Sequence, residues 1–530
     1  MIEKTAGTRR GRMIRALEFT YAAERCIAAA VLAAVLMAGL FVRAPWRVNA
    51  IASVLLANVV LSPWKLRLLF DIAVIGVVAG VAIWVVTPNN DVGFWRPHSF
   101  DVDVARAEAA RAITKEENAA ALYAELFSAY DFEDFEIGLY ASDAYGDMLT
   151  RRWTDAEFPE ARAWLADHAE AFAMLKEATD MAQCRFSLAT TQLERNAQML
   201  RTNLMKRWGL VLTCAVNSDL GEGRNAAAME KIRILRRMAQ HMYQQQMLLD
   251  MPRGLEVERM AYNAMGRLIM EGEPTQEDIG EMERWLWGVE DSLEADWRQV
   301  FEHEKLYIKQ VAGLLYEVNE GGSVRLSRHA VLAFDHQFRM GLHIVRRMEH
   351  APRVTALVLW FAIPHRPERL GRVIDRIFAR YFDEMSHPGG EEALRRRVGD
   401  PELNYKGIIE LAAWRTVNWV YPLRQQWAKR LTFRNAALVL ILLKRHHAAY
   451  GDWPEALEEM ADVAGSGIFL DPISGERLRY RRNSEGFMLY SIGRNGIDED
   501  GRGNPRDGTD DVMIWPARAS ILDAALLDGQ

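Results

Sequence analysis

Helical spacing of apolar residues runs through most of the sequence, and it constrains the fold more than any other feature. Apolar side chains at i, i+3, i+4 and i+7 occupy residues 117–130, 161–182, 225–251 and 275–318. This spacing is typical of helices that bury one face. No convincing strand pattern precedes about residue 468. We therefore expect a mainly α protein whose body, residues 88–445, is a helical domain of hairpins stacked as in a solenoid.

Apolar stretches near the N-terminus predict membrane spans. Residues 26–42 carry no charge and lie between Arg25 and Arg43, and the helical rise from one arginine to the other is about 27 Å, enough to cross a hydrocarbon core. Residues 48–61 and 68–86 are also apolar. The sequence thus predicts a fold class with N-terminal transmembrane helices within residues 25–87, preceded by a basic cytoplasmic tail, residues 1–24. Three spans would place the body outside the cytoplasm and two would leave it inside; flanking arginines and lysines favour three.

Charge is divided unevenly along the chain. Up to Thr87 there are ten Lys and Arg residues and four Asp and Glu residues, a balance of +6. Because the formal net charge of the whole chain is −7, the remaining residues carry −13. An acidic body argues against a nucleic-acid partner, because phosphate binding needs a clustered basic face. A basic N-terminus before an acidic body favours the inner (cytoplasmic) membrane as the location and the membrane as a partner, with the body extracytoplasmic.

The three cysteines do not indicate a disulfide scaffold or a zinc site. Cys26 lies in the first apolar stretch, and Cys184 and Cys214 lie in sequence with helical spacing. No CxxC pair with zinc-type spacing is present. Two alternatives stay open for Cys184 and Cys214: one bridge in an exported body, or two buried thiols in a cytosolic one.

The helical body offers a few residues for a reaction, none in a catalytic motif. His329, His336, His343 and His350 recur every seventh residue, but such residues lie about 10.5 Å apart along a helix, too far for neighbours to share one ion. Glu384 and His387 form an isolated ExxH without a partner motif. Because HExxH, GxSxG and nucleotide-binding motifs are missing, an envelope hydrolase using His336, Glu384 and His387 is the alternative rather than the main expectation.

Residues 446–516 form a different kind of module, followed by a tail, residues 517–530. A strongly apolar helix at residues 433–451 ends at Gly451, and a short second helix is expected after Asp452. Residues 476–483, 486–493 and 511–515 predict three strands. The sequence thus predicts a small α+β module in which a helix packs on a short antiparallel sheet.

An acidic loop joins the last two of these strands. Residues 489–511 contain five aspartates, one glutamate and five glycines. Hard oxygen ligands on a flexible backbone suit calcium, which takes about six to eight oxygens. The spacing is not that of an EF-hand, since Arg502 occupies a ligand position. A solvated loop neutralised by Arg502 and Arg506 is the alternative interpretation.

The module resembles a known family. The order YGDWPEALEEM, DPISGERLRYR, GFMLYSIGRNGIDEDG and DDV is similar to the C-terminal part of the type II secretion major pseudopilin, over about residues 446–515. The same ending resembles a broad group of uncharacterised bacterial membrane-anchored proteins with an α-helical middle. The pseudopilin resemblance implies a calcium ion in the last loop, with Asn495 at the place of a ligand aspartate and Asp510 or Asp511 at the later acidic ligand. The local sequence adds Asp498 and Asp500.

The N-terminus departs from the pseudopilin pattern. Gly11 is followed by RMIRALEF, which lacks the apolar helix with glutamate at the fifth position that a prepilin requires. The resemblance therefore implies a shared folded module and not a shared role. We expect a non-enzymatic, membrane-anchored envelope protein that acts as a scaffold or binds envelope proteins, with a calcium-stabilised C-terminal module. A secretion or assembly accessory protein is a further alternative.

Overall fold

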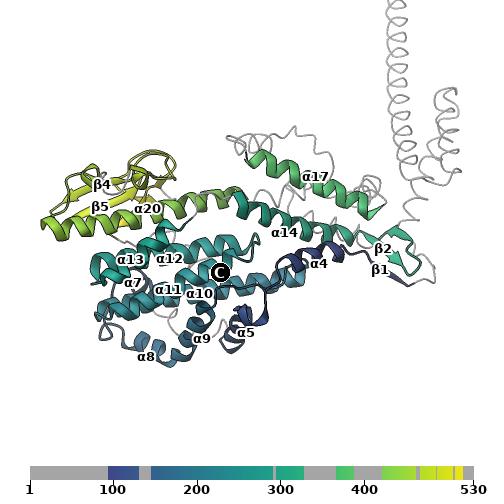
Figure 1. Ribbon diagram of the computed structural model, residues 1–530, viewed down its shortest axis with the longest axis horizontal. Coiled ribbons are helices and arrows are strands. Elements are labelled where there is room, and N and C mark those ends of the chain that lie inside the picture. Colours follow the sequence, from purple (N-terminus) through teal and green to yellow (C-terminus); the bar gives the residue numbers. More distant parts are fainter. Residues whose placement is uncertain are drawn as a thin grey trace, which may run out of the picture. The chain divides into compact units, whose positions relative to one another are not determined.

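The chain divides into two compact units in the computed structural model, Met1–Ser99 with Val311–Val373 and Phe100–Gln310 with Ile374–Gln530. The structure describes residues 94–130, 145–289, 294–327, 366–386, 420–460, 466–484, 486–504 and 508–516. These ranges are drawn as coloured ribbons in Figure 1.

The predicted membrane-spanning helices are the part of the fold class that needs the main correction. No helix in the described ranges is long and apolar enough to cross a membrane. The longest described helices, α10 (Gln192–Gly221) and α20 (Val420–Tyr450), have 30 and 31 residues, but charged side chains interrupt both. The predicted transmembrane fold class is therefore wrong for the described part of the chain. The stretches on which it rested, residues 26–42, 48–61 and 68–86, lie outside the described residues, as do the basic tail and residues 517–530.

The first unit contains a small antiparallel sheet that the sequence pattern did not predict. Its strands are β1 (Trp95–Pro97), β2 (Tyr316–Asn319) and β3 (Val324–Leu326), in the order β1-β2-β3. Tyr316 pairs with Leu326, and Trp95 pairs with Asn319. Three or four residues are too few for a visible alternation, and β1 and β2 lie more than 200 positions apart. The expectation of no strand before residue 468 is therefore wrong.

The second unit is mainly helical, which confirms the helical part of the prediction. Its shorter helices lie before α10, at α4 (Asp101–Ala110), α5 (Ala120–Ala129), α7 (Tyr145–Thr150), α8 (Pro159–Asp167) and α9 (Ala169–Asp180). The helices after α10 are α11 (Asn225–Tyr243), α12 (Asp250–Glu271), α13 (Gln276–Trp287) and α20, while α14 (Glu294–Gly313) and α17 (Pro367–Ser386) run across the unit boundary. Residues 275–318, where helical spacing predicted helix throughout, thus contain the two helices α13 and α14 and the strand β2.

Capping residues explain where two of these helices begin. The Thr191 side chain accepts a hydrogen bond from the backbone of Glu194 at the start of α10, and Glu194 bonds back to Thr191. Thr275 and Asp278 form the same reciprocal pair at the start of α13. Each capping box satisfies two backbone N–H groups that would lack a partner in the first turn.

The helices α10, α11 and α12 pack against one another in all three pairs, and α20 packs on α12. The first and third helices touch, so this is a bundle rather than a row of stacked hairpins. Two glycines permit the close approach. A Cβ at Gly209 would lie 3.1 Å from the Met260 sulfur, and one at Gly266 would lie 3.2 Å from Leu440. These contacts offset the roughly 1 kcal/mol that glycine costs inside a helix.

The two cysteines of the body are separate thiols. Cys184 and Cys214 are both free and buried, so they are two buried thiols and not one bridge. Burial raises the pKa of the Cys184 thiol to about 12 and raises that of Cys214 as well. Neither thiol is in the ionised form that reacts at neutral pH.

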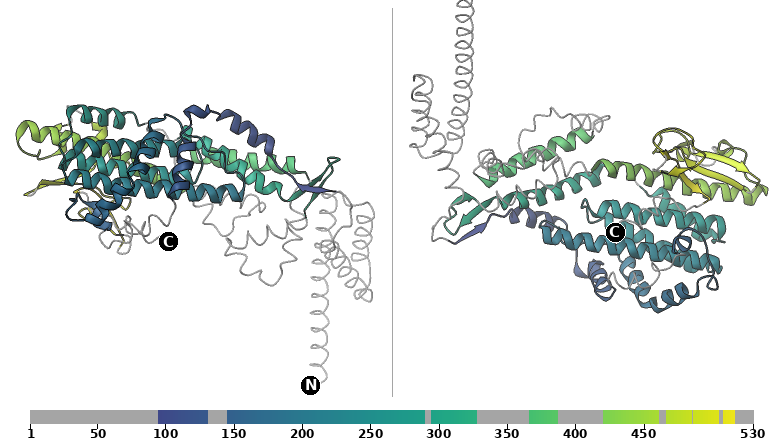
Figure 2. Two further views of the ribbon diagram at one scale, coloured as in Figure 1. Left: turned by 90° about the horizontal axis from the view of Figure 1, so that it is seen from below. Right: turned by 180° about the vertical axis from the view of Figure 1, so that it is seen from behind.

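The C-terminal module has the expected antiparallel sheet. Its strands are β4 (Arg479–Asn483), β5 (Gly486–Ser491) and β8 (Val512–Trp515), in the order β4-β5-β8. Figures 1 and 2 show this sheet beside the C-terminal half of α20. A short hairpin of β6 (Gly503–Asn504) and β7 (Thr509–Asp510) lies within the acidic loop. Buried side chains of the sheet belong to the same core cluster as the helices α10 to α12.

The helix expected after Asp452 is shorter than predicted. The structure has two 3-10 turns there, η5 (Leu457–Met460) and η6 (Ser466–Phe469), and no α-helix within the described residues between 451 and 478. The end of α20 is as expected, because Gly451 adopts φ 79°, the left-handed conformation that terminates helices.

Candidate metal centre

Three carboxylates of the acidic loop come together in the C-terminal module. Glu499, Asp510 and Asp511 each offer one oxygen, and these oxygens lie within 4.8 Å of one another. Glu499 belongs to the turn after β5, while Asp510 ends β7 and Asp511 precedes β8. The antiparallel pairing of β5 with β8 brings the two ends of the loop together.

Asp511 is the buried member of the cluster. It is 4% exposed. Its Oδ2 accepts hydrogen bonds from the backbone N–H groups of Glu499 (2.9 Å) and Gly501 (2.8 Å). Its Oδ1 is buried and has no hydrogen-bond donor among the described residues. An unsatisfied buried carboxylate oxygen is costly, so this atom points to a missing proton or cation.

Asp510 repeats this arrangement closer to the surface. Its Oδ2 accepts from the backbone N–H groups of Arg494 (2.8 Å) and Asn495 (3.3 Å). Its Oδ1 is also buried without a donor in the described part of the chain. Gly493 makes room for it: a Cβ there would lie 2.1 Å from this Oδ1, and the residue adopts φ 65°. Any other residue at position 493 would displace the carboxylate.

The pKa values of the cluster reflect crowded negative charge. Burial raises the pKa of Asp511 to about 6, and the neighbouring Glu499 carboxylate adds to the increase. Burial also acts on Glu499, but hydrogen bonds outweigh it and lower the pKa of Glu499, among them those from the Asn495 side chain and the Asp510 backbone N–H. Carboxylates this close cannot all ionise without a counter-charge. A bound cation would supply that charge.

Asn495 supports the cluster instead of joining it. Its Oδ1 accepts from the backbone N–H of Ile497 at 2.7 Å, and its Nδ2 donates to Glu499 Oε1 at 2.7 Å. The side chain therefore orients Glu499. In the resemblance to the pseudopilin, this is the position of a ligand aspartate, and here a neutral amide holds the neighbouring ligand.

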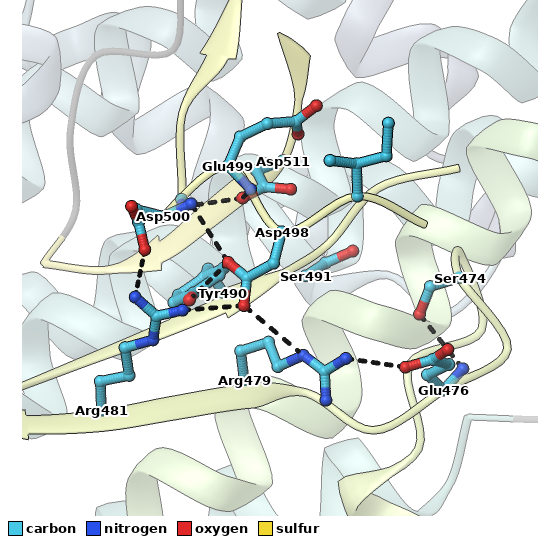
Figure 3. A network of polar contacts seen from close by, with 12 residues as sticks. Ser474, Glu476, Arg479, Arg481, Tyr490, Ser491, Asp498, Glu499, Asp500 and Asp511 are labelled. Carbon is cyan, nitrogen blue, oxygen red and sulfur yellow. Dashed lines mark hydrogen bonds and ion pairs between the residues drawn. The ribbon is translucent and has the colours of Figure 1, made fainter. Parts of the chain in front are cut away.

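Asp498 and Asp500 turn away from the cluster toward the strand β4. Both pair with Arg481, and Asp498 also accepts from the Tyr490 hydroxyl at 2.9 Å. Figure 3 shows Asp498 and Asp500 facing Arg481, and Glu499 beside Asp511. Of the five residues proposed from the sequence, the structure thus brings Asp510 and Asp511 together and places the other three around them.

Glu499 is the member of the cluster that the sequence analysis did not propose. Asp498 and Asp500 both pair with Arg481, whereas Glu499 between them lies with Asp510 and Asp511. The arginine neutralisation expected in the loop exists, but from a different source. Arg502 donates through Nε to the Glu499 carbonyl at 2.8 Å, whereas the carboxylates of Asp498 and Asp500 are neutralised from β4.

The donor set fits a hard divalent cation. It consists of three carboxylates and contains no nitrogen or sulfur ligand within the described residues. Calcium binds such oxygens at about 2.3–2.6 Å in a flexible geometry and completes its shell with water or backbone oxygens. The two buried Oδ1 atoms are the observation of fit, because both lack a donor among the described residues and both belong to aspartates of this cluster.

The residues of the alternative hydrolase site cannot be placed. His336 and His387 lie outside the described residues, as do His329, His343 and His350. Glu384 lies in α17. The proposed grouping of His336, Glu384 and His387 is therefore neither supported nor opposed by the structure.

Comparison with known proteins gives no match for this chain. No protein-family model matches it, and neither the curated proteins nor the solved structures contain a match. The resemblance to the pseudopilin module therefore stays a prediction from the sequence.

Proposed function

We propose that the chain is a non-enzymatic scaffold or binding protein whose C-terminal module is closed by a calcium ion. The observation that carries the proposal is the pair of buried, donor-less oxygens of Asp510 and Asp511 beside Glu499. The resemblance to the pseudopilin module supports calcium as the ion. The helical bundle and the module share one core, so closing the acidic loop also supports the body.

The ion acts on folding in this proposal. The ligands come from positions 499, 510 and 511 and meet only when the loop is closed, so calcium binds the folded form selectively. Such binding stabilises by RT ln(1 + [L]/Kd), about 2.7 kcal/mol at a ligand concentration one hundred times Kd. The loop thereby becomes rigid enough to present a fixed surface.

The proposal extends to location and partners. A calcium site of this kind is occupied where calcium is abundant, which favours an extracytoplasmic body. The partners would be other proteins of the cell envelope, in a scaffold or an assembly role similar to that suggested by the pseudopilin-like module.

Thermal unfolding tests the proposal. We expect calcium at one hundred times Kd to raise the melting temperature of the protein by about 2–4 °C over the value in chelator. The double variant Asp510→Asn/Asp511→Asn is expected to lose this increase, because two of three ligands become weak. The measurement is a pair of melts, with calcium and with chelator, for each protein.

A matched variant controls for the loss of charge. Glu455→Gln/Glu476→Gln removes two negative charges from exposed positions of the same module, so it is expected to keep the full calcium response. Identical melts with and without calcium in the unsubstituted protein would contradict the proposal. An equal loss of response in both double variants would reduce the effect to general screening.

A further inference from the structure

Residues 498 to 500 are held from two sides. Along this short segment the side chains alternate, with Asp498 and Asp500 directed at Arg481 and Glu499 at the carboxylate cluster. Figure 3 shows the guanidinium of Arg481 between the two aspartates. The Arg481 side chain of β4 thus forms ion pairs with both sequence neighbours of Glu499.

The contacts of Arg481 are specific in geometry. Its two terminal nitrogens are divided between the two carboxylates, with 2.8 Å from Nη2 to Asp498 Oδ2 and a short contact from Nη1 to Asp500 Oδ1. The guanidinium also lies 5.6 Å from the ring centre of Tyr490, whose hydroxyl donates to Asp498. A planar guanidinium can bridge two acceptors in this way, whereas an ammonium acts as a point charge.

The backbone of the same segment is fixed from the opposite side. Asp511 Oδ2 accepts from the N–H groups of Glu499 and Gly501, and the Asp500 N–H donates to Asp498 Oδ1 at 3.1 Å. Asp500 adopts φ 60°, a conformation that aspartate tolerates at a cost. The interaction with Arg481 therefore holds a strained residue directly after Glu499.

We propose that Arg481 is a positioning residue for the cation site, which fixes Asp498 and Asp500 so that Glu499 is presented to the ion. The inference rests on the proposed function, because it concerns the affinity of the same site. Arg481 contacts neither the ion nor its ligands. It raises affinity by lowering the conformational freedom that the loop loses when the ion binds.

Simple electrostatics predicts the opposite sign, which makes the inference testable. A positive charge near a cation site repels the cation, so its removal would raise affinity by about twofold to fourfold at a separation of about 10 Å in water. Removal would also free Asp498 and Asp500 to act as additional ligands. A positioning role predicts a loss of affinity in spite of both effects.

Arg482 provides the matched control. It is the next residue of the same strand and carries the same charge, but it pairs with Asp452 and Glu455 and with the Trp453 carbonyl. Arg482→Ala therefore removes an equal charge and surface ion pairs of the same kind. It leaves residues 498 to 500 untouched.

The experiment is calorimetric titration of calcium chloride into the full chain, its Arg481→Ala and Arg481→Lys variants, and Arg482→Ala. We expect Arg481→Ala to weaken calcium binding about fivefold to tenfold, and Arg481→Lys to recover part of the loss. Arg482→Ala is expected to bind as the unsubstituted protein does or slightly tighter. Partial rescue by lysine separates positioning from a general loss of structure.

Three negative outcomes are distinguishable. Unchanged or tighter binding by Arg481→Ala, with normal binding by the unsubstituted chain, would overturn the positioning role and leave the cation site standing. Equal weakening in the Arg481→Ala and Arg482→Ala variants would also overturn it, because the effect would then be one of strand stability. Absence of binding by the unsubstituted chain would instead contradict the proposed function.

Discussion

Replacement of Asp471 by alanine is expected to lower the free energy of unfolding by about 3–5 kcal/mol. Asp471 is completely buried, and its carboxylate receives five hydrogen bonds. The donors are the hydroxyl groups of Thr432, Ser474 and Ser491, at 2.6–2.7 Å, and the backbone N–H groups of residues 473 and 474, at 3.0 Å and 3.3 Å. Thr432 lies in α20 and Ser491 in β5, so this carboxylate joins the long helix to the sheet.

The size of the effect follows from what the substitution leaves behind. Alanine removes the acceptor and leaves five donors without it. The hydroxyls of Thr432 and Ser491 are fully buried, and each unsatisfied buried group costs about 1–3 kcal/mol before relaxation. Water entry would recover part of this cost. The loss would be concentrated in the C-terminal module, where β5 is anchored.

Chemical denaturation of the Asp471→Ala variant measures this effect, with Glu476→Ala as the control. Glu476 lies in the same turn, but its carboxylate is exposed and pairs with Arg479 on the surface, so its loss is expected to change stability by at most about 0.5 kcal/mol. Hydrogen exchange of the β5 amides would report the local loosening. Equal stability of the two variants would show that the Asp471 network does not hold the module.

Acidification from pH 6.5 to pH 4 is expected to destabilise the helical unit by about 3 kcal/mol for each of two buried histidines. His241 is completely buried, accepts from the Tyr123 hydroxyl through Nδ1 and donates through Nε2 to the Met181 carbonyl. His303 donates through Nδ1 to the Gln246 carbonyl at 2.8 Å. Burial lowers the pKa of both imidazoles to about 4.

The sign follows from where the protons bind. An unfolded histidine takes up a proton near pH 6.5, whereas these two in the folded chain do so only near pH 4. Between these values the unfolded state binds more protons, so stability falls as the pH decreases. Above pH 6.5 the full contribution is present, and below pH 4 no further loss arises from these groups.

The pH dependence of the unfolding free energy tests this directly. His241→Gln and His303→Gln replace each imidazole with a side chain that does not titrate, so each variant should show a flatter curve between pH 7 and pH 4 than the unsubstituted protein. Each variant's starting stability is expected to be lower, and only the slopes are compared. Curves parallel to that of the unsubstituted protein would contradict the assignment.

The local elements of the C-terminal module could be predicted because local signals specify them. Gly451 ends α20 in the left-handed conformation, and the apolar residues of β5 and β8 mark two paired strands. The sheet of the first unit could not be predicted. Its pairing of Trp95 with Asn319 joins distant short segments, and no local pattern in either segment specifies the partner.

The candidate site was predictable only to the level of the loop. A concentration of carboxylates indicates a cation, but which of them face it depends on the side-chain alternation at residues 498 to 500 and on the strand opposite. Arg481 of β4 pairs with Asp498 and Asp500, whereas Glu499 lies in the cluster with Asp510 and Asp511. A one-residue shift would reverse this assignment, and only the three-dimensional pairing decides it.

A calcium-soaked crystal structure tests the central claim most directly. The account predicts an anomalous difference peak within about 2.3–2.6 Å of one oxygen each from Glu499, Asp510 and Asp511. The Oδ1 atoms of the two aspartates, which lack a donor among the described residues, should both be ligands. No peak at this position at millimolar calcium, with a protonated Asp511 bonded to Glu499 or to water, would contradict the account.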